Sequence, residues 1–274
     1  MRSERRIGLV TGLVVGSAAL GLVALAAIVA PLVVPLDPLR TDLAGRLRPP
    51  STAHLLGQDA LGRDVLARLL AGARLSLAVG TSAVGLSLVV GVLVGCVAGW
   101  YGGWLDETIA RVIDVLLAFP GLLLAIALAA MLGPSPRNVV VALVVLGWTA
   151  YARVTRTQVR ALRRRELTDA ALALGASPAR VVGRHLLPLA VPVLLVQATF
   201  GLSGAIVAEA SLSFLGVGAP PPTPSWGAML DEGRQFMLVA PHLVLAPGLA
   251  LAATVLALQL LGDGLRDLLD VRQT

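Results

Sequence analysis

The side chains that enzymes most often use for catalysis are scarce and scattered in this sequence. There are 22 arginines and no lysine, which excludes a G-x-x-x-x-G-K-[ST] phosphate-binding loop and a lysine Schiff base. The one cysteine, Cys96, lies in an apolar block and cannot form an internal disulfide or a paired-thiol metal site. The histidines His54, His185 and His242 lack the i, i+4 spacing that places two metal ligands on one helix face. We therefore expect no catalytic residue, no metal site and no cofactor bound by this chain.

One serine pattern offers an alternative. The segment Gly201-Leu-Ser203-Gly204 resembles the G-x-S-G nucleophile segment of intramembrane serine proteases, and His242 in a later apolar block could act as the base. Small residues in an apolar helix are also ordinary packing elements. An intramembrane serine protease is therefore kept only as an alternative function.

The composition indicates an integral membrane protein. Of 274 residues, 57% are hydrophobic and 14% are charged, whereas soluble proteins carry about a quarter charged residues. The apolar residues form uncharged blocks of about 20 residues or more, the length that crosses a bilayer core of about 30 Å. We predict an all-α integral membrane protein with six transmembrane helices, which lie near residues 7–30, 75–99, 112–132, 138–153 with a continuation beyond, 186–208 and 238–261.

The chain is expected to divide near residue 74. Residues 1–74 would hold the first transmembrane helix and a polar outer loop, and residues 75–274 a core domain of five transmembrane helices. The uncharged stretch 7–30 is longer than the core of a signal peptide, which spans about 7–15 residues. We therefore expect a retained helix and not a cleaved signal.

The second half of the outer loop has the pattern of an amphipathic helix. Two acid–base pairs are spaced i, i+4, namely Asp59 with Arg63 and Asp64 with Arg68, and apolar residues share the other face. Such a helix is expected to lie in the membrane interface.

Small residues predict close packing in the second span. Gly91, Gly95 and Gly99 form two overlapping G-x-x-x-G patterns. Such a face lets two helix backbones approach closely, so we expect another helix to pack against it.

Arginine is unevenly distributed along the chain. The segment 151–188 carries eight arginines against two acids, which equals the net charge of +6 of the whole chain. With six spans, fourteen arginines fall on the side of the termini and eight on the other side. The positive-inside rule therefore places both termini and the 151–188 loop in the cytoplasm.

A defined turn interrupts this basic loop. The sequence predicts a short helix near 163–174, a turn at Gly175, and a second helix that starts at Pro178. Gly suits the left-handed position after a helix, and Ser177 followed by proline suits the start of the next. A basic loop held only by anionic lipid would not need these residues. The pattern favours a surface on which a soluble partner docks.

The same stretch resembles the EAA loop in permease subunits of bacterial ABC importers. That pattern is Glu-Ala-Ala, three residues, Gly, and Leu-Pro about a dozen residues later. Here the matching residues are Asp169, Ala170, Ala171, Gly175, Leu187 and Pro188. This chain departs from the pattern at two positions, with aspartate at the first position and His185 where isoleucine is favoured. Further segments resemble the dipeptide/oligopeptide/nickel branch, and within it the second of its two permease subunits; these are 54–74, 100–106, 117–120, 209–216, 224–227 and 261–267.

The resemblance implies a type I ABC importer permease bundle in the bacterial inner membrane. Such a subunit pairs with a second, homologous permease subunit around one translocation path. One or two ATP-binding subunits dock from the cytoplasm and bind ATP and Mg, and an extracytoplasmic binding protein delivers the substrate. No nucleic acid partner is implied. The resemblance assigns docking of the ATP-binding subunit to Asp169, Ala170, Ala171, Leu174, Gly175, Ala176, Ser177 and Pro188.

Glu209 stands apart as the only acid at the end of the fifth span. Carboxylates within a membrane are often functional, so Glu209 is a candidate gate residue, with a structural role as the alternative.

Di- or oligopeptides are the expected substrates, with nickel and other small solutes as alternatives. Selectivity would lie in the binding protein, because the apolar spans suit a path that holds its ligand weakly. A stand-alone channel or secondary transporter is a third class, but these often carry inverted repeats, and the sequence shows no internal repeat.

Overall fold

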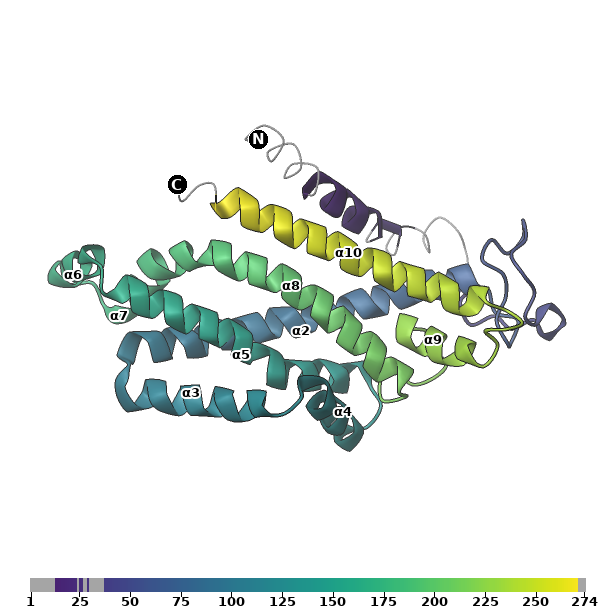
Figure 1. The fold of residues 1–274 in the computed structure, drawn as a ribbon, viewed down its shortest axis with the longest axis horizontal. Helices are drawn as coiled ribbons and strands as arrows, with labels where there is room; N and C mark the ends of the chain where they lie inside the picture. Colours follow the sequence, from purple (N-terminus) through teal and green to yellow (C-terminus); the bar gives the residue numbers. More distant parts are fainter. Residues whose placement is uncertain (1–12, 24, 27–28, 30–36, 271–274) are drawn as a thin grey trace.

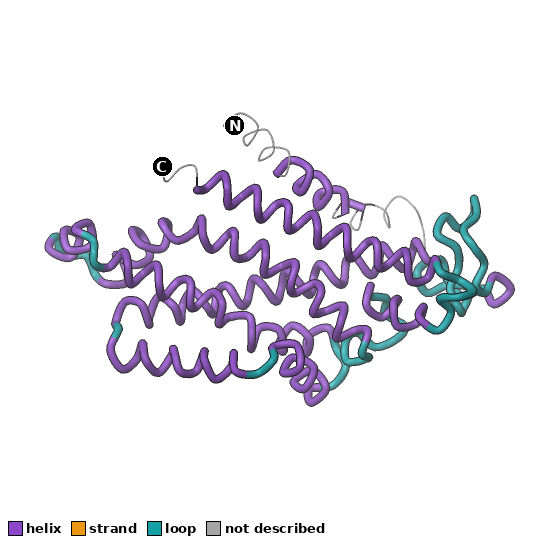
Figure 2. The backbone as a smooth tube through the Cα atoms, in the orientation of Figure 1, coloured by secondary structure: helices purple, strands orange, loops and turns teal. Residues whose placement is uncertain are grey.

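The computed structural model describes residues 13–23, 25–26, 29 and 37–270, and Figure 1 shows a bundle of long helices. Figure 2 shows helices and loops without a strand in this described part, where the one β pairing is an isolated bridge between Gln58 and Asp64. In chain order the elements after residue 37 are η1 (Leu43–Gly45), α2 (Val65–Tyr101), α3 (Gly103–Ala118), α4 (Gly121–Leu132), α5 (Pro136–Arg163), α6 (Glu166–Ala173), α7 (Pro178–Val181), η2 (Val182–Leu186), α8 (Leu187–Phe214), α9 (Trp226–Arg234) and α10 (His242–Asp270).

Among the residues that the structure describes, four helices are long and apolar enough to cross a membrane, and they contain α2, α5, α8 and α10; the bent pair of α3 and α4 would be a fifth if it counts as one span. The helix α5 extends past Arg153 to Arg163, which confirms the predicted continuation of a span that is too short at 138–153. The helix α10 also continues past the predicted end at residue 261. The predicted first span, 7–30, lies partly outside the described residues, where the structure gives a short apolar helix over Leu13–Val23.

The span predicted over 112–132 is bent in the structure. It is a pair of helices, α3 and α4, that meet at 87°. The break falls at Phe119, which has extended backbone angles and precedes Pro120. Proline disfavours the helical conformation in the residue before it, so α3 ends there and α4 starts in a new direction.

The G-x-x-x-G face of α2 packs against α5, as predicted. A side-chain carbon on Gly91 would lie 2.5 Å from the carbonyl oxygen of Trp148, and one on Gly95 would lie 2.6 Å from that of Ala152. Gly99 approaches the α5 backbone in the same way. Any larger residue at these positions would force the two helices apart.

The expected amphipathic helix of the outer loop is not a separate element. Residues from Val65 onward are the first turns of α2, and the Asp64 carboxylate caps them by accepting a hydrogen bond from the amide of Ala67 at 2.8 Å. Arg68 is only 2% exposed, so this segment does not lie on the membrane surface. The division into 1–74 and 75–274 stays a prediction, and α2 runs across its boundary.

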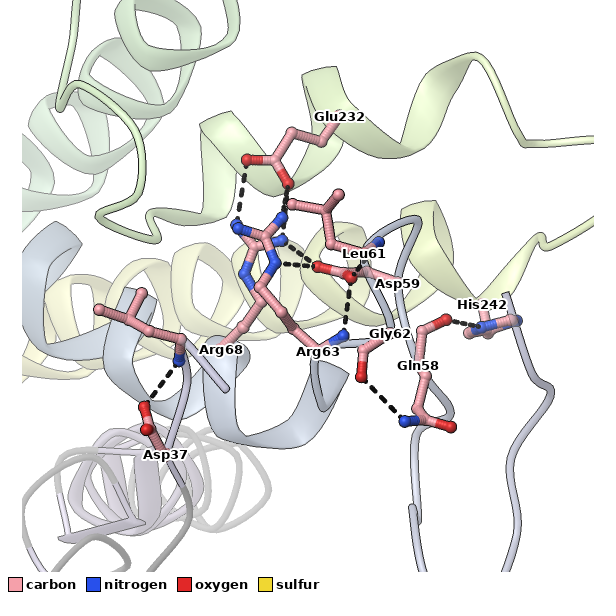
Figure 3. A network of polar contacts seen from close by, with 10 residues as sticks. Asp37, Gln58, Asp59, Leu61, Gly62, Arg63, Arg68, Glu232 and His242 are labelled. Atoms are coloured by element: carbon pink, nitrogen blue, oxygen red, sulfur yellow. Dashed lines mark hydrogen bonds and ion pairs between the residues drawn. The ribbon is translucent and has the colours of Figure 1, made fainter. Parts of the chain in front are cut away.

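An ion-pair network joins the outer loop to α9 (Figure 3). The predicted pair of Asp59 and Arg63 is present at 2.6 Å. Arg68 does not pair with Asp64 but reaches Asp59 and Glu232 of α9, both at 2.6 Å. Figure 1 places this loop and α9 at one end of the bundle and α6 and α7 at the other. The two polar ends are therefore separated by the length of the membrane-spanning helices.

Candidate functional site

The helix α6 is folded back against the end of α5 by a side-chain contact. The Thr168 hydroxyl is buried and donates a hydrogen bond to the carbonyl oxygen of Leu162 at 3.0 Å. The amide of Arg165 donates to the same oxygen at 3.1 Å. These two bonds satisfy an end carbonyl of α5 and hold the first turn of α6 in place.

The turn after α6 is a complete Schellman motif. The amide of Gly175 donates to the Leu172 carbonyl at 2.9 Å, and the amide of Ala176 donates to the Ala171 carbonyl at 3.0 Å. Gly175 has a φ of +83°, the left-handed conformation that this motif needs after the helix. The structure thus confirms the predicted turn and its physical cause.

The second short helix also begins as predicted. Ser177 is the N-cap of α7, and its hydroxyl accepts a hydrogen bond from the amide of Arg180 at 3.4 Å. Pro178 occupies the first helical position, where its missing N–H costs nothing. The chain continues through the π-helical segment Val182–Leu186 into α8 without a loop.

The expected docking residues fall into two groups by exposure. Ala171 and Ala176 are partly buried and pack on an apolar cluster that includes Trp100 of α2 and Val159 of α5. The side chain of Leu174 is 90% exposed. The other expected docking residues are exposed as well, namely Asp169, Ala170, Gly175, Ser177 and Pro188. The exposed side of α6 and the following turn therefore carries the apolar side chain of Leu174, while Ala171 and Ala176 on the opposite side pack against the bundle.

Leu172, which the sequence reasoning missed, belongs to the exposed group. Its side chain is 40% exposed and neighbours Leu174 along the chain. Helical spacing could not have identified it, because Leu172 lies four residues after the buried Thr168 and is therefore expected near the same face of the helix.

Arginines near the end of α5 tie it to α2 and α3. Arg156 forms a two-pronged ion pair with the largely buried Asp106 of α3, with one N···O distance of 2.8 Å, and Arg160 contacts the same carboxylate at 3.4 Å. Arg163 donates to the carbonyl of Trp100 and lies 5.4 Å from the centre of its ring. Arg156, Arg160 and Arg163 thus hold the end of α5, next to α6, against α2 and α3.

Glu209 lies near the other end of α8 and is 2% exposed. Its carboxylate accepts hydrogen bonds from the hydroxyls of Ser76 in α2 and Ser213 in α8, each at 2.7 Å. Both oxygens are therefore used within the bundle. These contacts fit a residue that joins two helices better than they fit a residue that faces an open path.

The structure does not bring together the serine and histidine of the protease alternative. The Ser203 hydroxyl donates to the Phe200 carbonyl at 2.8 Å and accepts from Gln259 of α10 at 3.2 Å. His242 begins α10 and contacts the Gln58 carbonyl at 3.4 Å. His242 and Gln259 are 17 positions apart on α10, about 25 Å at 1.5 Å per residue, so His242 is too far from Ser203 to exchange a proton with it. This alternative is not supported.

Within the described residues there is no group of three or more His, Cys, Asp or Glu side chains that could hold a metal ion.

Comparisons with known proteins agree with the architecture. The family described as "Binding-protein-dependent transport system inner membrane component" matches residues 91–274. The chain is 44% identical over 246 residues to the dipeptide transport system permease protein of Alkalihalophilus pseudofirmus, covering 90% of this chain and 81% of that protein. It is 47% identical over 221 residues to the glutathione transport system permease protein of Pectobacterium atrosepticum, covering 81% of this chain and 73% of that protein.

A solved structure gives the same fold. A chain of the inward-facing MetNI methionine ABC transporter superposes with a TM-score of 0.59 at 22% identity, covering 71% of this chain and 93% of that chain. The family match and the two relatives show that this chain belongs to the binding-protein-dependent transport system inner membrane components and is a multi-pass transport permease, not an enzyme.

Proposed function

We propose that this permease is one half of the translocation path of an ATP-driven importer, and that a separate ATP-binding subunit docks on α6 and the turn after it. The observation that carries the proposal is the exposed Leu174, an apolar side chain on a rigid turn at the end of the bundle. The charged residues Arg165, Glu166 and Asp169 precede it in sequence and are exposed, which favours an aqueous protein partner over the interior of a bilayer.

Movement of a docked α6 would reach the membrane helices by three routes. Thr168 links α6 to the end of α5, and α7 continues directly into α8. The apolar cluster under the turn contains Trp100 of α2, so α2 follows as well. Closure of the ATP-binding subunits would thus shift α2, α5 and α8 together. Alternating access requires two such global states, whose balance the ATP-binding subunits bias.

We place α6, α7 and both chain termini in the cytoplasm, and the outer loop with α9 outside. The arginine bias of residues 151–188 supports this orientation. The proposed partners are a second homologous permease subunit, one or two ATP-binding subunits that hold ATP and Mg, and an extracytoplasmic binding protein that delivers substrate. The lipid bilayer surrounds the bundle, and no nucleic acid takes part.

Di- or oligopeptides are the proposed substrates. The two relatives above are named for dipeptide and glutathione transport, and glutathione is itself a small peptide. Nickel or another small solute is the alternative, and uptake assays with each solute decide between them.

For Glu209 we propose a structural role, in which the carboxylate fixes α8 to α2. A gate residue would have to release the hydroxyls of Ser76 and Ser213 in each cycle, and both bonds are short and buried. A loss of stability without a change in solute selectivity in Glu209 variants would support the structural role.

The test of the proposed function is purification of the whole complex through a tag on this chain, followed by reconstitution in lipid vesicles. Co-purification of ATP-binding subunits and uptake of labelled alanyl-alanine or glutathione are expected. Gly175→Asp should abolish uptake while part of the complex still assembles, because it places a negative charge beside the exposed Leu174 on the proposed docking turn. Uptake that persists without any ATP-binding subunit would refute the proposal.

A further inference from the structure

Two neighbouring helices, α3 and α5, each carry a row of charged side chains. The residues of each row recur every three or four positions and so share one side of their helix; they are Glu107, Arg111 and Asp114 on α3, and Arg153, Arg156 and Arg160 on α5. Arg153 donates to the carboxylate of Asp114 at 3.2 Å, which joins the two rows. We call these six residues the charged face.

The ion pair of Asp114 and Arg153 is open to the surroundings of the chain. The Asp114 side chain is 70% exposed and that of Arg153 is 55% exposed. Glu107 and Arg111 pair with each other on α3 and are exposed as well. Any molecule that fills the space beside α3 and α5 therefore meets charges of both signs.

This exposed pair lies deep in the membrane-spanning part. Asp114 comes ten positions after Trp104 of α3, whose exposed indole suits the membrane–water boundary. Arg153 comes ten positions before Arg163, which contacts Trp100 at the end of α2. Figure 1 shows α3 running alongside α5. Ten residues of helix span about 15 Å, so both helices place the pair about halfway through a bilayer core of about 30 Å.

Charges at this depth are not expected to face lipid. An ionised side chain in hydrocarbon is costly, so charged residues in membrane spans nearly always face water or another protein chain. The charged face also adjoins a groove of about 360 Å³ beside Tyr151, which residues of α2, α3, α4, α5 and α8 line. Tyr151 is two positions from Arg153, so the charged face extends from this groove toward the end of the bundle that carries α6.

We propose that the charged face lines the water-filled cytoplasmic half of the translocation path and contacts the ionised ends of the transported peptide. The inference rests on the proposed function and deepens it by naming where this subunit touches its substrate. A free dipeptide carries an ammonium and a carboxylate at neutral pH. Asp114 and Arg153 offer the opposite charge to each of these groups. Ion pairs exposed to water are worth little, so the peptide exchanges partners with the pair and is released.

Thiol labelling of the reconstituted complex tests whether the charged face meets water. Cys96 is the one cysteine of the chain, so Cys96→Ser provides a thiol-free background for this subunit. In that background Asp114→Cys should react with a positively charged methanethiosulfonate reagent added on the side of the ATP-binding subunits. A nonhydrolysable ATP analogue, added with the loaded binding protein, should abolish the reaction, because alternating access then closes this half of the path. The control is Leu93→Cys, at an exposed apolar position of α2 eight residues before Tyr101, which should stay unlabelled in both states.

Uptake tests whether the charges themselves contribute. The double variant Asp114→Leu with Arg153→Leu should lower uptake of labelled alanyl-alanine on the order of tenfold, because an apolar stretch of the path excludes water. Asp114→Glu with Arg153→Lys keeps both charges and should recover most of that loss. Leu93→Ile, on the apolar face of α2, is the control and should transport at the parental rate.

The outcomes separate this inference from the proposed function. If the double leucine variant takes up peptide at the parental rate while Gly175→Asp abolishes uptake, the charged face lies outside the path and the docking proposal stands. Labelling of Asp114→Cys that the ATP analogue does not change would also overturn the inference. If Asp114→Cys stays unlabelled and the double leucine variant loses the second permease subunit during purification, the charged face is a subunit interface and the inference is wrong. If the parental complex takes up neither alanyl-alanine nor glutathione, the proposed function itself fails.

Discussion

Replacement of Gly175 by alanine isolates the role of the turn between α6 and α7. Gly175 has a φ of +83°, and no atom lies within 4 Å of the position that an alanine side chain would take. The variant therefore creates no clash within the chain. Its cost is conformational, about 1–2 kcal/mol for an L-residue in the left-handed region. That energy lowers the population of the correctly folded turn relative to an altered one by a factor of about 5–30.

The chain contains a matched control for this substitution. Gly216 has a φ of +78° and ends α8 in the same Schellman motif, with its amide bonded to the Ser213 carbonyl at 3.1 Å. The amide of Val217 donates to the Leu212 carbonyl at 3.0 Å, and a side chain at Gly216 also meets open space. Gly216→Ala therefore carries the same local cost at the opposite end of the bundle.

The assay compares peptide uptake and ATP hydrolysis in vesicles that contain the complete transporter. Gly175→Ala should lower the ratio of peptide transported to ATP hydrolysed, whereas Gly216→Ala should keep the parental ratio. Gly175→Asn should fall between glycine and alanine, because asparagine tolerates the left-handed conformation better. Equal losses in the Gly175 and Gly216 variants would refute the reasoning, since the effect would then be general destabilisation. Equal losses for asparagine and alanine at residue 175 would show direct contact of the side chain with the partner.

Two further substitutions test the packing that transmits the movement. Gly95→Leu should lower the melting temperature of the detergent-solubilised complex, because a side chain there meets the Ala152 carbonyl at 2.6 Å and overpacking costs about 1–3 kcal/mol or more. The control is Gly85→Leu, because a side chain at that position meets open space. An equal fall in melting temperature in both variants would contradict the account. Glu209→Ala should destabilise the complex by about 1–3 kcal/mol, because it leaves the buried Ser76 and Ser213 hydroxyls without their acceptor. Glu209→Gln keeps a carbonyl acceptor and should cost less, and a glutamine variant as unstable as the alanine variant would argue against hydrogen bonding as the cause.

The sequence was most informative where structure is determined locally. The turn after α6 depends on Gly175, Ser177 and Pro178, whose backbone preferences act within a few residues. The G-x-x-x-G face of α2 also predicted close packing, although it could not name α5 as the partner helix. Hydropathy located the apolar spans but not their bends, since Phe119 and Pro120 lie inside a continuous apolar stretch.

Features that depend on distant parts of the chain could not be predicted. Spacing along the sequence pairs Arg68 with Asp64, yet the folded chain offers Glu232, which is 164 residues away. Once Arg68 is buried beside that partner, the segment becomes part of α2 and cannot lie on the membrane surface. The groove beside Tyr151 is likewise lined by residues of five helices, α2, α3, α4, α5 and α8, and none of their individual patterns indicates it.

The central claim is that Leu174 meets an ATP-binding subunit in the cytoplasm. Its direct test is a pair of single-cysteine variants in the Cys96→Ser background, Leu174→Cys at the tip after α6 and Leu238→Cys, a 96% exposed position in the loop between α9 and α10. In intact cells a membrane-impermeant thiol reagent should label residue 238 and not residue 174, and a short bifunctional cross-linker should join residue 174 to an ATP-binding subunit. Labelling of residue 174 from outside the cell, with no cross-link to such a subunit, would contradict the account.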